Sequence, residues 1–201
     1  MNTRKLPVNL ENPIDNVFIN FADKSSTMFK KVNLTPNFLT TISLFFGLLS
    51  VYLFYIDNYV LSALFFGIAY YFDCADGFYA RKYNMVTKFG DYYDHIADLL
   101  KVILLIIVMY YKSSEKLIKI FPIILIALIF SLVHLGCQEI YYNINYKNGI
   151  GNDSLSSLKR LCPCNSKKIN IIRKTIEYTR YFGSGTLTIV LIFFILMWNC
   201  I

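Results

Sequence analysis

The stretch FDCADGFYARKYNMVTKFGDYYDHIAD, from Phe72 to Asp98, places five aspartates between two long apolar runs. The whole chain is 56% hydrophobic, well above the fraction found in ordinary soluble domains. An ionised carboxylate at membrane depth is costly unless it is paired or bound to a cation. The stretch therefore indicates where a membrane-like chain holds a functional site.

Apolar segments of about the length that a helix needs to cross a bilayer recur along the chain. They occupy residues 37–56, 59–80, 89–111, 117–141 and 184–201. The sequence thus predicts an all-α fold, a polytopic integral membrane helix bundle of five to six transmembrane helices in one domain over residues 1–201. A sixth span would need residues 169–183 to form a polar-lined helix that continues into 184–201. The first 35 residues contain no continuous apolar run, so no removable signal peptide is expected.

The N-terminal region divides into two parts. Residues 1–11 are expected to form a loose tail, and a helix is predicted to begin at Asn12 and Pro13, a capping residue followed by proline at the first helical position. The apolar residues that follow at helical spacing are Ile14, Val17, Phe18 and Phe21. This narrow stripe predicts an amphipathic helix over 12–31 that lies in the membrane interface.

The basic residues predict the orientation of the chain. Sixteen Lys and Arg residues fall in the N-terminal arm, the second connection and the segment after the fourth span, against three on the opposite face. Because cytoplasmic loops are rich in Lys and Arg, we expect the N-terminus, the active site and the loop 142–168 on the cytoplasmic side. Their position in short loops argues against a nucleic-acid partner. Within the domain, residues 37–111 would form the catalytic helices and 117–201 the rest.

The five cysteines do not predict a disulfide framework. Their number is odd, and Cys74 and Cys137 fall inside spans. Cys162 and Cys164 are the only close pair, and they lack the usual two-residue spacer and the second pair that a tetrahedral zinc site requires.

The aspartates fall on two predicted helices. Asp73 and Asp76 are three residues apart on one helix, and Asp94 and Asp98 are four apart on the next, so each pair shares a face. If the helices are neighbours, four carboxylates converge, and only Arg81 is near enough in sequence to neutralise any of them. A bound divalent cation would balance this charge, and oxygen ligands suit Mg²⁺ or Mn²⁺, with room for two ions. The alternative is a set of solvated loop acids between two spans.

Eight residues of this region resemble the hallmark of the CDP-alcohol phosphotransferase family (CDP-alcohol phosphatidyltransferase, class I), the integral-membrane enzymes of phospholipid synthesis. The pattern reads Asp73-x-x-Asp76-Gly77-x-x-Ala80-Arg81, eight residues, then Gly90-x-x-x-Asp94-x-x-x-Asp98. All eight identities fit the family spacing. The resemblance implies transfer of a phosphoalcohol group from a CDP-linked donor to an acceptor hydroxyl, with release of CMP.

The resemblance also implies roles for single residues. Asp73, Asp76 and Asp94 would be metal ligands, and Asp98 would complete the metal pair or take the acceptor proton, which makes Asp94 and Asp98 the candidate catalytic residues. The residues implied for the CDP moiety are Gly77, Ala80, Arg81, Gly90, Asn37 and Thr40, the last two in the first-span entry that begins at Pro36.

Other polar residues remain open. Arg173, Lys174 and Arg180 are candidates for binding a phosphorylated acceptor at the cytoplasmic mouth, or they are juxtamembrane cations. Asp91 lies outside the family pattern, and two alternatives are open for it: its side chain reaches the site, or it stays solvated. His95 contacts the acceptor or packs, and His134 is expected to be a satisfied interior residue.

The preferred reaction joins CDP-diacylglycerol and a small polar alcohol to give a phospholipid and CMP. The alternative within the family is transfer from CDP-choline or CDP-ethanolamine to diacylglycerol. An intramembrane prenyltransferase or a membrane metal transporter is more distant. The expected partners are the CDP-linked donor, the alcohol acceptor and the lipid bilayer, and a homodimer stays open.

Overall fold

The computed structural model describes residues 3–145, 154–163 and 169–201, and the regular elements in these ranges are all helical, as the sequence predicts. The elements in chain order are α1 (Pro13–Lys31), α2 (Pro36–Tyr55), α3 (Tyr59–Lys82), α4 (Lys88–Lys112), α5 (Ser114–Asn145), the 3₁₀ helix η1 (Ser154–Leu161), α6 (Ile169–Thr179), the 3₁₀ turn η2 (Arg180–Phe182) and α7 (Ser184–Leu196). The first four predicted spans correspond to α2, α3, α4 and α5.

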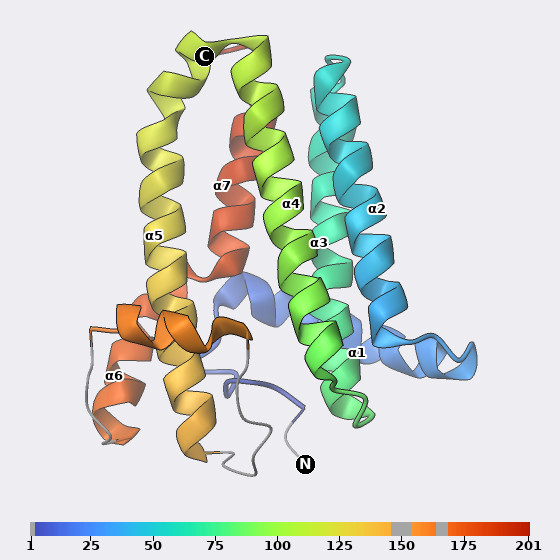
Figure 1. Ribbon diagram of the computed structural model, residues 1–201, viewed down its shortest axis with the longest axis vertical. Helices are drawn as coiled ribbons and strands as arrows, with labels where there is room; N and C mark the ends of the chain where they lie inside the picture. The colour runs from blue at the N-terminus through green and yellow to red at the C-terminus, as the bar shows by residue number, and fades with distance from the viewer. Residues whose placement is uncertain (1–2, 146–153, 164–168) are drawn as a thin grey trace.

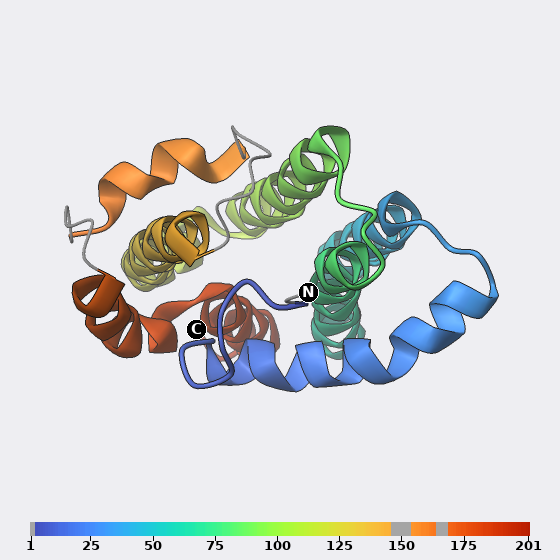
Figure 2. The same ribbon diagram turned by 90° about the horizontal axis from the view of Figure 1, so that it is seen from below.

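The long helices form an elongated bundle (Figure 1). Helices α2, α3, α4, α5 and α7 run along its long axis, with the α4–α5 connection and the C-terminus at one end. The α3–α4 loop, the N-terminal arm, α6 and η1 lie at the opposite end, which we call the motif end (Figures 1 and 2). Apolar residues from α2, α3, α4, α5 and α7, among them Phe54, Leu105 and Trp198, form the largest buried cluster.

Three segments of the described chain are long and apolar enough to cross a membrane: Pro36–Tyr55, Ser114–Asn145 and Ile169–Leu196, the last combining α6, η2 and α7. This supports the prediction of an integral membrane protein. Helices α3 and α4 are also long, at 24 and 25 residues, but charged side chains occupy their motif ends. Whether these two cross the bilayer stays a prediction.

Helix α1 begins as predicted and lies across the bundle (Figure 2). The Asn12 side chain caps it by accepting hydrogen bonds from the backbone N–H groups of Ile14 and Asp15. The face that packs on α3 carries Ile19 and Ala22, whereas Val17 and Phe21 from the predicted stripe are exposed. Exposed apolar residues on this helix agree with a position in the interface.

The N-terminal arm, residues 3–11, is not the loose tail that the sequence suggests. Leu6 and Leu10 are fully buried against α5 and α6, in a cluster with Ile172 and Ile176. The Asn16 side chain also donates a hydrogen bond to the carbonyl of Val8, at 2.8 Å. The expectation fails because the residues that bury Leu6 and Leu10 lie more than 100 positions away in the sequence.

The last part of the chain is broken rather than continuous. Helix α6 is amphipathic, as predicted, with Ile172 and Ile176 buried. Thr179 ends it, and the turn η2 and the extended backbone of Gly183 separate it from α7. Of the predicted loop 142–168, residues 146–153 and 164–168 lie outside the described residues.

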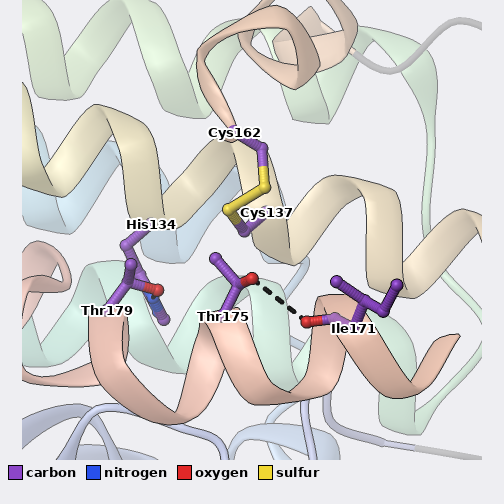
Figure 3. The surroundings of a disulfide bond; sticks show 6 residues. All are labelled: His134, Cys137, Cys162, Ile171, Thr175 and Thr179. Atoms are coloured by element: carbon purple, nitrogen blue, oxygen red, sulfur yellow. Dashed lines mark hydrogen bonds between the residues drawn. A yellow bond between two sulfur atoms is a disulfide. The ribbon is translucent and has the colours of Figure 1, made fainter. Parts of the chain in front are cut away.

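One disulfide corrects the expectation drawn from the cysteines. Cys137 on α5 and Cys162, just after η1, are joined, with their Cα atoms 4.9 Å apart (Figure 3). The close pair of Cys162 and Cys164 therefore cannot act as a thiolate pair, and Cys164 lies outside the described residues. Disulfides persist mainly in oxidising compartments, so this bond is at odds with a cytoplasmic motif end, and the orientation stays a prediction.

Candidate active site

Helix α3 brings its first two acidic residues to the motif end of the bundle. Asp76 is 3% exposed, and its Oδ2 accepts a hydrogen bond from Thr40 Oγ1 on α2. Asp73 is half-buried one turn earlier, and its Oδ1 is buried without a hydrogen bond from a described residue. This contact from α2 holds the Asp76 carboxylate in place and brings Thr40, a residue implied for the CDP moiety, next to the motif.

Helix α4 supplies the other two carboxylates. Asp73, Asp94 and Asp98 each offer an oxygen such that the three atoms lie within 4.8 Å of one another. Asp94 Oδ1 is also buried without a hydrogen bond from a described residue. The two helix ends therefore converge as the sequence predicts, with Asp76 bonded to Thr40 beside them.

Lys101 is the charge that the sequence reasoning missed. It is 6% exposed on α4, and its Nζ lies 2.6 Å from Asp98 Oδ1, 3.7 Å from Asp73 Oδ1 and 2.8 Å from Ser43 Oγ. Arg81 is thus not the only nearby cation. The signal was present, because Lys101 follows Asp98 by three residues and shares its helical face.

Two glycines of the motif allow close approach. A Cβ on Gly90 would lie 2.8 Å from Asn37 Oδ1, so the absence of a side chain lets α2 and α4 meet here. A Cβ on Gly77 would lie 3.2 Å from Arg81 Nη1, so the guanidinium lies over this glycine. Ala80 is half-buried on the same helix.

A small polar cavity of about 130 Å³ adjoins these residues. Asp73, Asp76, Asp94 and Arg81 line it, and Gln138 from α5 and Ser184 from α7 contribute to its wall. The N-terminal arm closes another side with Lys5 and Glu11. Arg81 Nε donates a hydrogen bond to the Thr3 carbonyl at 3.1 Å, which ties the arm to the motif helix.

Two carboxyl groups at the start of α1 add to the acidity of this cavity. The pKa of Glu11 is raised from 4.5 to about 7, mainly by burial and to a smaller extent by the nearby Asp15 carboxylate. Burial likewise raises the pKa of Asp15 from 3.8 to about 6, although the Tyr70 hydroxyl donates a hydrogen bond to it at 2.6 Å. Glu11 is therefore about half protonated near neutral pH.

The remaining candidates fall in different places. Arg173 pairs with Glu177 on the exposed face of α6, Lys174 is exposed, and Arg180 Nη1 donates to the Asn9 carbonyl. None of these three cations is among the residues that line the cavity. They stay predictions for the acceptor site.

The histidines and Asp91 are also placed. His95 Nδ1 lies 3.7 Å from Asp94 Oδ2, and its Nε2 lies 3.5 Å from Asp91 Oδ1, so His95 links the two acids on α4. His134 is 1% exposed, and its Nδ1 lies 3.1 Å from Thr179 Oγ1 (Figure 3). His134 is therefore an interior residue as expected, but it is satisfied only at Nδ1, since its Nε2 is buried without a hydrogen bond from a described residue.

The donor set fits a divalent cation. Buried carboxylate oxygens that accept no hydrogen bond from described residues are costly, and a cation would satisfy those of Asp73 and Asp94. Oxygen-only ligands suit Mg²⁺ or Mn²⁺.

Comparison with known proteins agrees with this geometry. The model of the CDP-alcohol phosphatidyltransferase family matches residues 33–199, most of the chain. The chain belongs to this family. Membership of this family confirms the resemblance drawn from the eight motif residues, and the match extends beyond them on both sides, from residue 33 to residue 199.

Curated relatives match a smaller part of the chain than the family model does. CDP-diacylglycerol–glycerol-3-phosphate 3-phosphatidyltransferase of Rickettsia typhi is 46% identical over 70 residues, 33% of this chain and 39% of the relative. The archaetidylinositol phosphate synthase of Pyrococcus horikoshii is 36% identical over 69 residues, 34% and 37% of the two chains. The matched part thus spans about two fifths of these relatives. No solved structure matches the chain.

Proposed function

We propose that this member of the CDP-alcohol phosphatidyltransferase family transfers the phosphatidyl group of CDP-diacylglycerol to the hydroxyl of a small polar alcohol. The observation that carries the proposal is the meeting of Asp73, Asp94 and Asp98 within 4.8 Å beside a polar cavity. The Rickettsia typhi relative, whose name gives CDP-diacylglycerol as donor, supports this choice of donor.

The reaction forms one bond and breaks one. The acceptor oxygen attacks the phosphorus that carries the diacylglycerol, and the bond from this phosphorus to the bridging oxygen breaks, so that CMP leaves. Asp98 takes the acceptor proton, and Lys101 at 2.6 Å holds its carboxylate in place. Positioning and charge stabilisation dominate phosphoryl transfer, which fits a site made of fixed charges.

Asp73, Asp76, Asp94 and Asp98 would hold one or two divalent cations, Mg²⁺ or Mn²⁺. When bound, such ions neutralise the charge of the diphosphate and of the developing transition state. The chain's own contributions are the Thr40 hydroxyl, which orients Asp76, and the burial of Asp76, which is 3% exposed.

The proposed CDP site lies where α2 meets the motif. Asn37 and Thr40 face Gly90 and Asp76, respectively, and Gly77 leaves room beneath the Arg81 guanidinium. The lipid part of the donor would lie in the bilayer beside these helices, on the predicted cytoplasmic side. Oligomeric state does not enter the proposal.

The test uses purified full-length protein in lipid vesicles. Labelled CDP-diacylglycerol, CDP-choline and CDP-ethanolamine are offered in turn with their acceptors, and lipid product and CMP are measured with and without EDTA. Product from CDP-diacylglycerol that EDTA abolishes and Mg²⁺ or Mn²⁺ restores is the expected result. Product only from CDP-choline or CDP-ethanolamine would favour the family alternative, and no product from any donor would refute the transferase.

A further inference from the structure

The N-terminal arm adds a cation to the cavity that neither the motif nor the family match contains. We propose that Lys5 binds the phosphate of a phosphorylated alcohol acceptor, so that the arm selects this class of acceptor. The inference rests on the proposed transfer reaction and names the acceptor class for the same site. Lys5 precedes residue 33, where the family match begins.

The volume of the cavity favours a small polar ligand. Its volume of about 130 Å³ is well below the roughly 300–1,000 Å³ of pockets that enclose drug-sized ligands. Such a space is too small to enclose a whole nucleotide or a lipid chain, whereas a short alcohol with a phosphate is of suitable size. The acceptor hydroxyl would then lie beside Asp73 and Asp94, which line the cavity and whose carboxylate oxygens lie within 4.8 Å of that of Asp98.

Five carboxylates and two cations line the cavity, and the proposed divalent cation would balance those of Asp73, Asp76 and Asp94, which leaves Lys5 and Arg81 to receive an anion. Lys5 Nζ is 3.2 Å from Glu139 Oε1, and the Lys5 side chain remains 25% exposed. Glu139 is 1% exposed, and its Oε2 is buried without a hydrogen bond from a described residue. Glu139 therefore holds the ammonium at the cavity wall. Lys101, in contrast, is buried between Asp98 and Asp73 and faces the proposed metal site.

The arm is held well enough to place this ammonium. Leu6, next to Lys5, is fully buried, and Thr3 accepts a hydrogen bond from Arg81 two residues before Lys5. Arg4 donates hydrogen bonds of 2.6 Å to the side chains of Asn16 and Asn20 on α1. Lys5 thus lies between fixed neighbours, and Arg81 lines the same cavity as a second cation. A phosphate bound there would accept charge-assisted hydrogen bonds.

Lys5→Gln tests the inference in the vesicle assay, with CDP-diacylglycerol as donor and either glycerol 3-phosphate or glycerol, and myo-inositol phosphate or myo-inositol, as acceptor. We expect the wild type to use a phosphorylated acceptor. Lys5→Gln should raise the KM for that acceptor about 10- to 100-fold, since a hydrogen bond to a charged group is lost. The KM for CDP-diacylglycerol and kcat should change less than about twofold, because a uniform binding contact affects KM alone.

Three comparisons make the result decisive. Lys5→Arg should keep most of the affinity, and Lys24→Gln on the exposed surface of α1 should match the wild type. Glycerol 3-phosphate or myo-inositol phosphate, whichever is used, should raise the Tm of the wild type and of Lys5→Arg but not of Lys5→Gln. This binding measurement separates loss of the phosphate contact from loss of fold.

Other outcomes would overturn the inference. An unchanged acceptor KM in Lys5→Gln, or an increase in Lys174→Gln instead, would move the phosphate site away from the arm. Use of unphosphorylated acceptors alone would leave the transferase intact and refute the role of Lys5. Absence of lipid product from every donor would refute the proposed function and, with it, this inference.

Discussion

Acidic residues occur at both ends of the bundle, but their surroundings differ. At the α2–α3 turn, Asp57 has a side chain that is 68% exposed, and Lys112 Nζ lies 2.6 Å from it. At the motif end, Asp73 and Asp98 share one buried ammonium, that of Lys101. Water and one lysine are enough for the first acid, whereas the second group, which includes buried Asp76, holds more carboxylates than the single ammonium balances. Burial relative to available cations, more than the number of acids, marks the functional end.

The largest effect is expected from Asp94→Asn, which keeps the shape of the side chain and removes its charge. Activity should fall about a thousandfold or more, because metal-assisted charge stabilisation contributes several kcal/mol to such reactions. The matched variant at the other end, Asp57→Asn, should keep near wild-type activity. Phosphatidyl transfer in vesicles at equal protein content gives both values. Similar losses in the two variants would remove the distinction between the ends.

Lys101→Met tests how much the buried ammonium contributes to stability and activity at the motif end. The variant leaves Asp73 and Asp98 without their ammonium; removal of one partner from a fully buried ion pair typically costs about 3–5 kcal/mol, and the cost is smaller here because the Asp98 side chain is 42% exposed. We expect a large drop in Tm in EDTA and a smaller one with saturating Mg²⁺, since a bound cation replaces the lost charge. Activity should fall about tenfold or more as Asp98 loses its anchor. Lys112→Met, whose carboxylate partner is exposed, should show no dependence on Mg²⁺.

Glu11→Gln tests whether the buried carboxyl group of Glu11 lowers the stability of the protein near neutral pH. Burial raises the pKa of Glu11 from 4.5 to about 7, so the native state holds a proton that the unfolded chain loses between these values. Stability should therefore fall as pH rises from about 4.5 to 7. The variant should exceed the wild type above pH 7, by on the order of 3 kcal/mol, and lose this advantage near pH 5. Thermal unfolding at several pH values measures it, with exposed Glu177→Gln as control.

The smallest effect is expected from Gly90→Ala. Its Cβ would press on Asn37 Oδ1, a side-chain atom that can move, so the cost should be about 1–3 kcal/mol. The KM for the CDP donor should rise severalfold as Asn37 is displaced. Gly67→Ala is the matched control, because its Cβ would lie at an ordinary 3.7 Å from Ile192 Cδ1. Unchanged donor binding in Gly90→Ala would show that the contact between α2 and α4 does not contribute to binding of the CDP donor.

Local patterns in the sequence predicted the helices and the convergence of the acids. Helix periodicity determines which residues of α3 and α4 share a face, and the lengths of the apolar segments indicate which residues form the long helices. The contact between Lys5 and Glu139 joins residues 134 positions apart, and Cys137 and Cys162 are separated by 25. Neither pairing follows from spacing, since both depend on how the chain returns to the motif end. Lys101, in contrast, follows Asp98 by three residues, so helical spacing alone predicts its contact with that carboxylate.

The hydrogen bond between Thr3 and Arg81 has a practical consequence for handling the protein. A polypeptide joined to the N-terminus would begin within a few residues of Arg81, which lines the cavity. An affinity tag placed after Ile201 would instead emerge at the far end of the bundle (Figure 1). Preparations tagged at the two termini should therefore differ in apparent acceptor affinity, even when they contain the same enzyme.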